Sequence, residues 1–168
     1  MAQKTYVPEG EAAPASQIGA SLETLAATIE ARRGAGEESY TYRLLTASPD
    51  KVLKKLMEEA GEVALAAKDV EGWATSSVAA ALAFESGAGR AAEPDELAVQ
   101  LPPEYDEAVN HLRYEAGDVV YHLLVVLARY GISIDELAAE MNSRMAEDEI
   151  AVHEGMIRLK PEHVNRGR

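Results

Sequence analysis

Five acidic side chains stand out because they lie in two segments whose other residues are largely apolar. The first group is Glu58, Glu59 and Glu62, and the second is Glu115 and Asp118. Residues three or four positions apart share one side of a helix, so each group would form one acidic patch. Crowded carboxylates disfavour one another's ionisation, and a divalent cation with oxygen ligands relieves that repulsion. The sequence therefore predicts a carboxylate site for Mg²⁺.

The residue types of this predicted site suit work on phosphates. Magnesium is usually held by few carboxylates, keeps several waters and binds substrate phosphates. It neutralises phosphate oxygens and activates water, which favours attack on a phosphoanhydride bond. Acids on a helix are more often a solvated face, and Glu58 and Glu59 stand near Lys54 and Lys55, as they would on such a face. Helix position alone leaves both interpretations open.

Asp118 and His122 favour the functional interpretation. At about 100° per residue, one narrow helical stripe contains His111, Glu115, Asp118 and His122. The segment 119–128 is otherwise almost wholly apolar. A single histidine in such a segment is more often a satisfied core residue, but its alignment with two acids makes it a plausible partner of the site.

Helix start and stop signals indicate which elements carry these residues. The expected helices run from Ser21, as N-cap, to about Arg33; from Ser48 and Pro49 to about Asp69; from Pro103 to about Tyr130, the longest; and from Ile134 to about Glu147. Ser133 and Glu136 form a capping box for the last helix. Since Ala and Leu dominate the apolar residues and no alternating strand pattern persists, we expect an all-α bundle.

Two of these helices have an apolar side next to their acids. The first such side holds Val52, Leu53, Leu56, Ala60, Val63, Ala64 and Ala67, and the second holds Leu112, Ala116, Val119, Val120, Leu123 and Leu127. If the acidic flanks of the two helices face each other, four or five carboxylates come together. That arrangement is costly without a cation.

The rest of the chain is expected to form a leader, an insertion and a tail around one domain. We expect a loose leader over 1–20, a single helical domain over 21–148 and a C-terminal tail over 149–168. Residues 70–103 read as an insertion between two core helices. Within it, 73–84 is alanine-rich enough to form a helix, and we hypothesise that this segment extends a dimer interface.

Composition excludes several classes of protein. The chain has 168 residues with 29 acids against 16 bases, and its net charge of −13 argues against nucleic acid as a partner. It contains no cysteine, so disulfides and thiolate metal sites are excluded. No signal peptide and no apolar run of about 18–20 residues is present, so we expect a cytoplasmic protein with no membrane partner.

The acidic motif resembles that of a known group. Glu58-Glu59-x-x-Glu62 followed by Glu115-x-x-Asp118 is similar to the EExxE…ExxD signature of the all-helical, MazG-like nucleoside triphosphate pyrophosphohydrolases. Further segments resemble the phosphoribosyl-ATP pyrophosphohydrolase family of histidine biosynthesis, namely Ser39-Tyr40-Thr41, Lys54-Lys55, Glu58 to Val63, Glu115 to Leu124 and Gly131-Ile132-Ser133. The gap between Glu62 and Glu115 is longer than this family usually shows.

The resemblance implies Mg²⁺-dependent hydrolysis of phosphoribosyl-ATP to phosphoribosyl-AMP and pyrophosphate by a homodimeric helical bundle. It implies metal ligation by Glu59, Glu62, Glu115 and Asp118, and a second ion or an oriented water at Glu58, which with Glu59 would be catalytic. Substrate-binding positions would be Tyr40, Lys54, Lys55, Lys68 and His122. Two alternatives remain at this stage, namely a house-cleaning hydrolase of ordinary or modified nucleoside triphosphates and a non-enzymatic helical dimerisation module.

Overall fold

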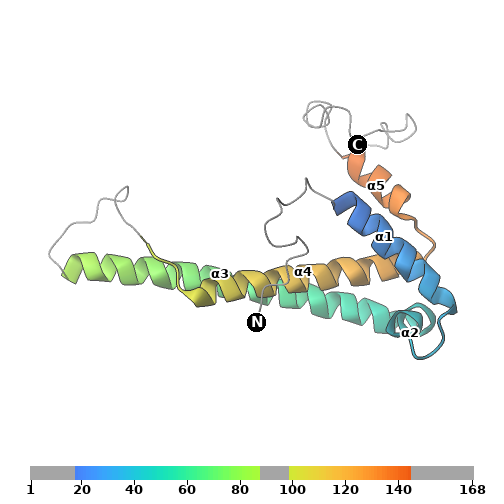
Figure 1. Cartoon of the computed structure of the whole chain (residues 1–168), viewed down its shortest axis with the longest axis horizontal. Coiled ribbons are helices and arrows are strands. Elements are labelled where there is room, and N and C mark those ends of the chain that lie inside the picture. The colour runs from blue at the N-terminus through green and yellow to red at the C-terminus, as the bar shows by residue number, and fades with distance from the viewer. Residues whose placement is uncertain (1–17, 88–98, 145–168) are drawn as a thin grey trace, which may run out of the picture.

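The computed structural model describes residues 18–87 and 99–144, and these residues form helices with no strand among them (Figure 1). In chain order the elements are α1 (Ile18–Ala31), the 3₁₀ helix η1 (Arg32–Gly34), α2 (Tyr40–Thr46), α3 (Pro49–Gly87), α4 (Pro103–Arg129) and α5 (Ile134–Asn142). The predicted all-α class is confirmed for this part of the chain.

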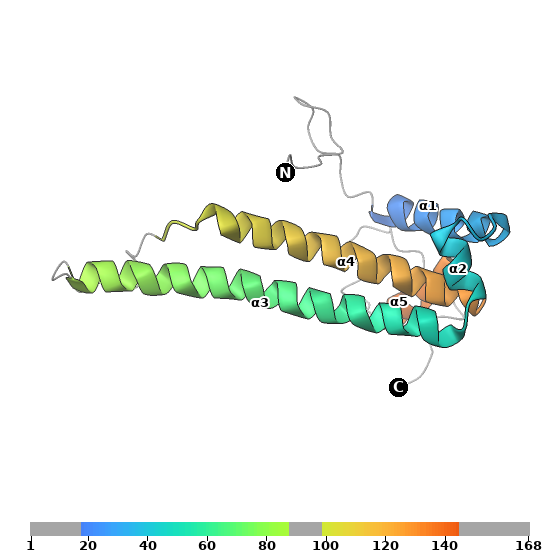
Figure 2. The ribbon, with the colours of Figure 1, turned by 90° about the horizontal axis from the view of Figure 1, so that it is seen from below.

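Helices α3 and α4 lie side by side as a long antiparallel pair (Figures 1 and 2). They contain 39 and 27 residues, so α3 alone spans about 58 Å at about 1.5 Å per residue. The three shorter helices α1, α2 and α5 gather at the end of the pair where α3 begins and α4 ends. The pair is thus supported at one end.

Along the pair, buried residues recur every seven positions. On α3 they are Val52, Glu59 and Ala66, and on α4 the matching row is Ala108, Glu115 and His122. A seven-residue spacing keeps one side of each helix against its partner, as in a coiled coil. We call these six residues the seam. Two acids and a histidine occupy seam positions that are usually apolar, and this arrangement places the candidate site between the helices.

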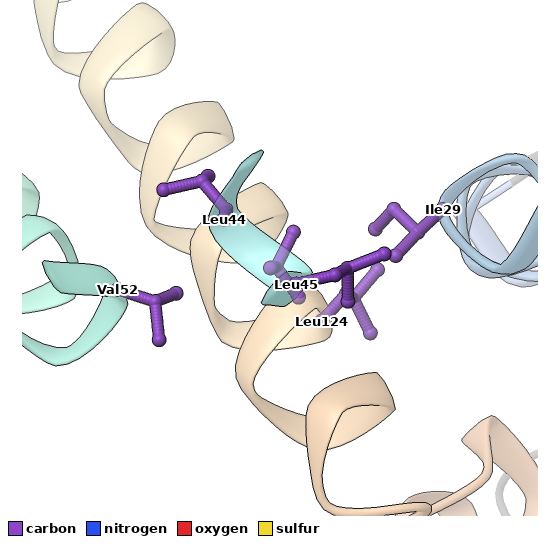
Figure 3. Packing of buried hydrophobic residues seen from close by; sticks show 6 residues of the cluster. Ile29, Leu44, Leu45, Val52 and Leu124 are labelled. Carbon is purple, nitrogen blue, oxygen red and sulfur yellow. The ribbon is translucent and has the colours of Figure 1, made fainter. Parts of the chain in front are cut away.

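The apolar core lies where the short helices meet the pair. It consists of Ile29, Leu44, Leu45, Val52, Leu124 and Val125, contributed by α1 to α4, and Figure 3 shows five of them labelled. Arg129 Nη1 also donates to the carbonyl oxygens of Leu44 (3.0 Å) and Leu45 (2.8 Å). These bonds satisfy carbonyls near the C-terminal end of α2 that lack helical partners. The core and this arginine fix α2 against α4.

The expected starts of α4 and α5 are confirmed. Pro103 is the first residue of α4, and Ser133 with Glu136 forms the predicted capping box of α5. Hydrogen bonds from the backbone and side chain of Ser133 lower the pKa of the Glu136 carboxyl. Between the two helices, Gly131 has φ of 70°, a left-handed conformation that glycine adopts without steric cost.

Some other expected boundaries were wrong, although α3 begins at Pro49 and α4 ends beside Tyr130, as expected. Ser21 lies inside α1, which already includes Ile18, and α5 ends at Asn142. The second helix does not stop near Asp69 but continues to Gly87, so α3 rather than α4 is the longest helix. Residues 70–87 contain no proline and many alanines, and the roughly 1 kcal/mol cost of one interior glycine, Gly72, does not end the helix.

Several expectations fall outside the described residues. These are most of the leader, the tail, the glycine- and proline-containing part of the insertion at 88–98, and the last residues of the predicted 21–148 domain. Within the described residues, no single helix is long and apolar enough to cross a membrane. Only α4 and α5 taken together have the length and apolar composition of a membrane span, and the two helices are bent by 110° relative to each other.

Candidate metal and phosphate site

Three carboxylates converge between α3 and α4. One oxygen each from Glu59, Glu115 and Asp118 can be chosen so that all lie within 4.8 Å of one another. The Glu59 and Glu115 residues are only 5% and 7% exposed, and Asp118 is half-buried. Glu59 and Glu115 are seam residues, while Asp118 lies one turn beyond Glu115. The acidic flanks of the two helices therefore face each other, with three converging carboxylates where four or five were considered.

The convergence has the electrostatic effect expected of crowded acids. Burial, and then the negative charges of Glu59 and Glu115, raise the pKa of the Asp118 carboxyl. Glu62 is exposed at the edge of the cluster, and a hydrogen bond with the Glu59 side chain raises its pKa. Asp118 and Glu62 therefore hold a proton more readily than isolated carboxyl groups would.

Lys55 is the cation that offsets this charge at Glu59. Its Nζ lies 2.8 Å from Glu59 Oε1 and 3.1 Å from Glu58 Oε2. The hydrogen bond from Lys55 lowers the pKa of the Glu59 carboxyl, although burial acts in the opposite direction. Reciprocally, the hydrogen bonds to Glu59 and Glu58 raise the pKa of the Lys55 ammonium above its usual range.

His122 is buried beside the cluster and fully engaged. Its Nδ1 lies 2.9 Å from the backbone oxygen of Asp118 and 3.8 Å from Glu59 Oε1, and its Nε2 lies 3.1 Å from the Tyr40 hydroxyl. Since a carbonyl oxygen only accepts, Nδ1 carries the hydrogen, and in the neutral ring Tyr40 donates to Nε2. Burial is the main cause of a raised pKa of the Tyr40 hydroxyl.

An aromatic group surrounds this histidine. The Tyr121 ring lies edge-on to His122 at 5.0 Å and stacks against Tyr40 at 6.4 Å between centroids. The Tyr121 hydroxyl is 2.8 Å from Thr41 Oγ1. Tyr40 thus packs as well as hydrogen-bonds, and α2 forms one wall of the region next to the carboxylates. The sequence alone indicates no role for Tyr121 or Thr41, because their pairing depends on how α2 docks on α4.

A second histidine contacts the cluster from outside. His111 Nε2 lies 2.9 Å from Glu115 Oε1, and the His111 side chain is exposed. His111 belongs to the helical stripe of Glu115 and Asp118, but no role was predicted for it. The contact was predictable from the spacing of His111 and Glu115, because residues four apart on a helix can contact each other directly.

The remaining predicted site residues lie further from the three carboxylates. Glu58 is exposed and is contacted by Lys55 and by Lys54, whose Nζ lies 3.4 Å from Glu58 Oε1. Lys68 pairs with Glu71 and follows Glu59 by nine residues, about 14 Å along the helix axis. The roles given to Glu58, Lys54 and Lys68 therefore stay predictions.

The donor set fits a small, hard divalent cation. Carboxylate oxygens are the ligands that Mg²⁺ prefers, and two ligands about 2.1 Å from one ion lie at most about 4.2 Å apart. The three oxygens lie within 4.8 Å of one another, so ligation requires a movement of about half an ångström at most, which small side-chain rotations can supply. Burial and then the charges of Glu59 and Glu115 raise the pKa of Asp118, and a bound cation would offset both effects.

Comparisons with known proteins agree with this geometry. The family model described as "Phosphoribosyl-ATP pyrophosphohydrolase" matches residues 22–145. A protein named phosphoribosyl-ATP pyrophosphatase from Paracidovorax citrulli is 34% identical over 79% of this chain and 76% of its own length. Proteins of the same name from Rhodobacter capsulatus (34% identical; 78% of this chain, 92% of theirs) and Methylobacterium nodulans (37%; 68% and 73%) are also similar. No solved structure matches the chain.

Proposed function

Because the chain belongs to the phosphoribosyl-ATP pyrophosphohydrolase family, we propose that it hydrolyses phosphoribosyl-ATP to phosphoribosyl-AMP and pyrophosphate, a step of histidine biosynthesis. The observation that best supports this reaction is the convergence of Glu59, Glu115 and Asp118 between α3 and α4. A substrate that carries a triphosphate brings the negative charge that a cation on these carboxylates would bind.

We propose that Glu59, Glu115 and Asp118 hold Mg²⁺, with Glu62 completing the set from the edge of the cluster. When bound, the ion would neutralise phosphate oxygens and favour the attack of water on the α–β phosphoanhydride. The hydrogen bond with Glu59 that raises the pKa of Glu62 would be lost on loading, because metal ligands bind as ionised carboxylates.

The chain's own cations and hydrogen bonds would position the other reactants. Lys55 and Lys54 lie next to Glu58 on the exposed side of α3, where the departing pyrophosphate group could be bound. Glu58 carries a carboxyl whose pKa the Lys55 and Lys54 side chains lower, so it stays ionised and can orient water. Tyr40 and His122 keep the wall of the site in place, and their contact with substrate follows only from the family resemblance.

A homodimer is also part of the proposal. Val120 and Leu123 of α4 are both 37% exposed, while Glu115 of the same helix is buried. Leu53, Met57 and Leu65 of α3 are likewise exposed. A helix pair that buries Glu59 and Glu115 and leaves this many large apolar side chains in contact with solvent is stabilised if a second copy covers them.

The deciding experiment measures pyrophosphate release from phosphoribosyl-ATP, ATP and dCTP, each with Mg²⁺ and with EDTA. We expect metal-dependent release from phosphoribosyl-ATP in large excess over the simple triphosphates. Release mainly from ATP or dCTP would move the chain to the house-cleaning group and keep the metal site. No release from any substrate would contradict an enzymatic role and leave the dimerisation module as the interpretation.

A further inference from the structure

The position of Lys55 carries an inference that rests on the proposed metal site. Its ammonium lies 2.8 Å from Oε1 of Glu59, a residue that also supplies one of the three converging oxygens. Glu59 is 5% exposed, whereas the Lys55 side chain is 36% exposed. A half-exposed cation thus caps a buried carboxylate.

Lys55 affects the whole cluster as well as its direct partner. Its positive charge lowers the pKa values of Asp118, Glu62 and Tyr40, each of which other groups raise. Among the described residues, Lys55 is the only lysine or arginine with an ion pair to any of the three converging carboxylates. In the metal-free protein it therefore supplies charge neutralisation that a divalent cation would otherwise supply.

We propose that Lys55 is an exchangeable counter-ion: it neutralises Glu59 in the metal-free protein, and a divalent cation that replaces it frees its ammonium for a phosphate group of the nucleotide. The exchange is geometrically simple, because a second carboxylate already holds Nζ. Glu58 Oε2 lies 3.1 Å from Nζ, so the ammonium keeps a partner on the exposed side of α3 when Glu59 turns to the metal.

This exchange links two binding events. A cation that must displace Lys55 binds the free protein more weakly than it would bind an uncapped carboxylate cluster. Once displaced, the same lysine strengthens binding of a phosphorylated ligand. Loss of the Lys55 charge should therefore change the two affinities in opposite directions. A purely structural ion pair would not produce that result.

The test is a titration of the full-length protein with Mn²⁺ alone, monitored through the signal of the free ion at pH 8. We compare wild type, Lys55→Gln, Lys55→Arg and Lys54→Gln, because Lys54 contacts Glu58 but not Glu59. Gln preserves helix propensity, and circular dichroism checks that each variant is folded. We expect Lys55→Gln to bind Mn²⁺ roughly tenfold more tightly or better, and the other two variants to match wild type within about threefold.

A second titration adds inorganic pyrophosphate to the Mn²⁺-loaded proteins. Here Lys55→Gln should bind about tenfold more weakly than wild type, and Lys55→Arg should retain affinity. Unchanged or weaker Mn²⁺ binding by Lys55→Gln, or unchanged pyrophosphate binding, would overturn the exchange. If the exchange is overturned but wild type binds Mn²⁺ and releases pyrophosphate from phosphoribosyl-ATP, the proposed function is still supported. If wild type binds no Mn²⁺, the metal site fails with it.

Discussion

The hydroxyl oxygen of Tyr40 lies 3.1 Å from Nε2 of His122, and this hydrogen bond joins the first residue of α2 to the seam of α3 and α4. The bond leaves the other ring nitrogen for the Asp118 carbonyl, so it fixes both the tautomer and the orientation of a buried histidine. Helix α2 is therefore part of the scaffold that holds the carboxylates.

Tyr40→Phe should destabilise the fold by about 1 kcal/mol, because it leaves Nε2 of a buried histidine without its donor. For a chain of this size the melting temperature should fall by roughly 2–4 °C. Thermal unfolding followed by circular dichroism measures the change. Tyr114→Phe is the matched control, since Tyr114 is 68% exposed and should tolerate the same chemical change. Equal melting temperatures for wild type and Tyr40→Phe would contradict the role of this bond.

Glu115→Gln should abolish most of the metal-dependent hydrolysis. The substitution keeps the size of the side chain and removes one of three converging carboxylate charges. We expect kcat to fall by about 100-fold or more, since loss of even an indirect partner of a bound metal typically costs about 10–100-fold. Glu107→Gln, at an exposed position of the same helix, should keep wild-type activity. Similar rates for the two variants would show that Glu115 is not a ligand.

Asp118→Asn should stabilise the metal-free protein near neutral pH. The folded-state pKa of Asp118 is raised, so its ionised form disfavours folding at pH values above that pKa. Asparagine removes this penalty, and each kcal/mol gained should raise the melting temperature by roughly 2–4 °C. As pH falls through the folded-state pKa toward the unfolded value of about 3.9, wild type takes up a proton and the difference should shrink.

Magnesium should make wild type more stable than Asp118→Asn. With saturating Mg²⁺, wild type gains stability through binding, whereas Asp118→Asn lacks one ligand and gains little. Melting curves at pH 5 to 8, with EDTA and with Mg²⁺, measure both effects. A variant that is less stable than wild type in EDTA at every pH would show that Asp118 has a structural role rather than a repulsive one.

The double substitution Val120→Glu with Leu123→Glu should dissociate the proposed dimer without unfolding the chain. Both side chains are partly exposed on α4, so charge there costs little in the isolated chain but much in an apolar interface. Light scattering after size-exclusion chromatography gives the mass. Asn110→Glu, an exposed polar position of α4, should leave the mass unchanged. A wild-type protein that elutes as one chain would reject the dimer directly.

Local signals were sufficient to predict several helix ends and three of the acids that converge between α3 and α4. Pro103 and the Ser133–Glu136 box act through bonds within a few residues of each helix start, so their sequence patterns determine those starts. Glu115 and Asp118 lie on the same side of α4 because they are three residues apart. The family resemblance drawn from these motifs is confirmed by the comparisons.

Features that depend on long-range packing were not predictable in the same way. The helix continues from Asp69 to Gly87 because the helix propensities of an alanine-rich stretch add up. This sum outweighs the unfavourable propensity of a single glycine. The sequence also showed a broad apolar side on α4, including Val120 and Leu123, yet the side that meets α3 carries Glu115 and His122. Only the packed helices show that α4 buries the side with Glu115 and His122 against α3 and leaves Val120 and Leu123 partly exposed.

The seam also implies how the molecule opens. In the part of α3 that the structure describes, the last buried residue is Ala66, although the helix continues to Gly87, and in α4 the first is Ala108. Amide hydrogen exchange should therefore be fastest over residues 75–87, slower around Glu59 and slowest near Val52 and Val125. Transient fraying would reach the carboxylates before it reached the core. Ligands that bridge the two helices would then slow exchange well beyond the residues they contact.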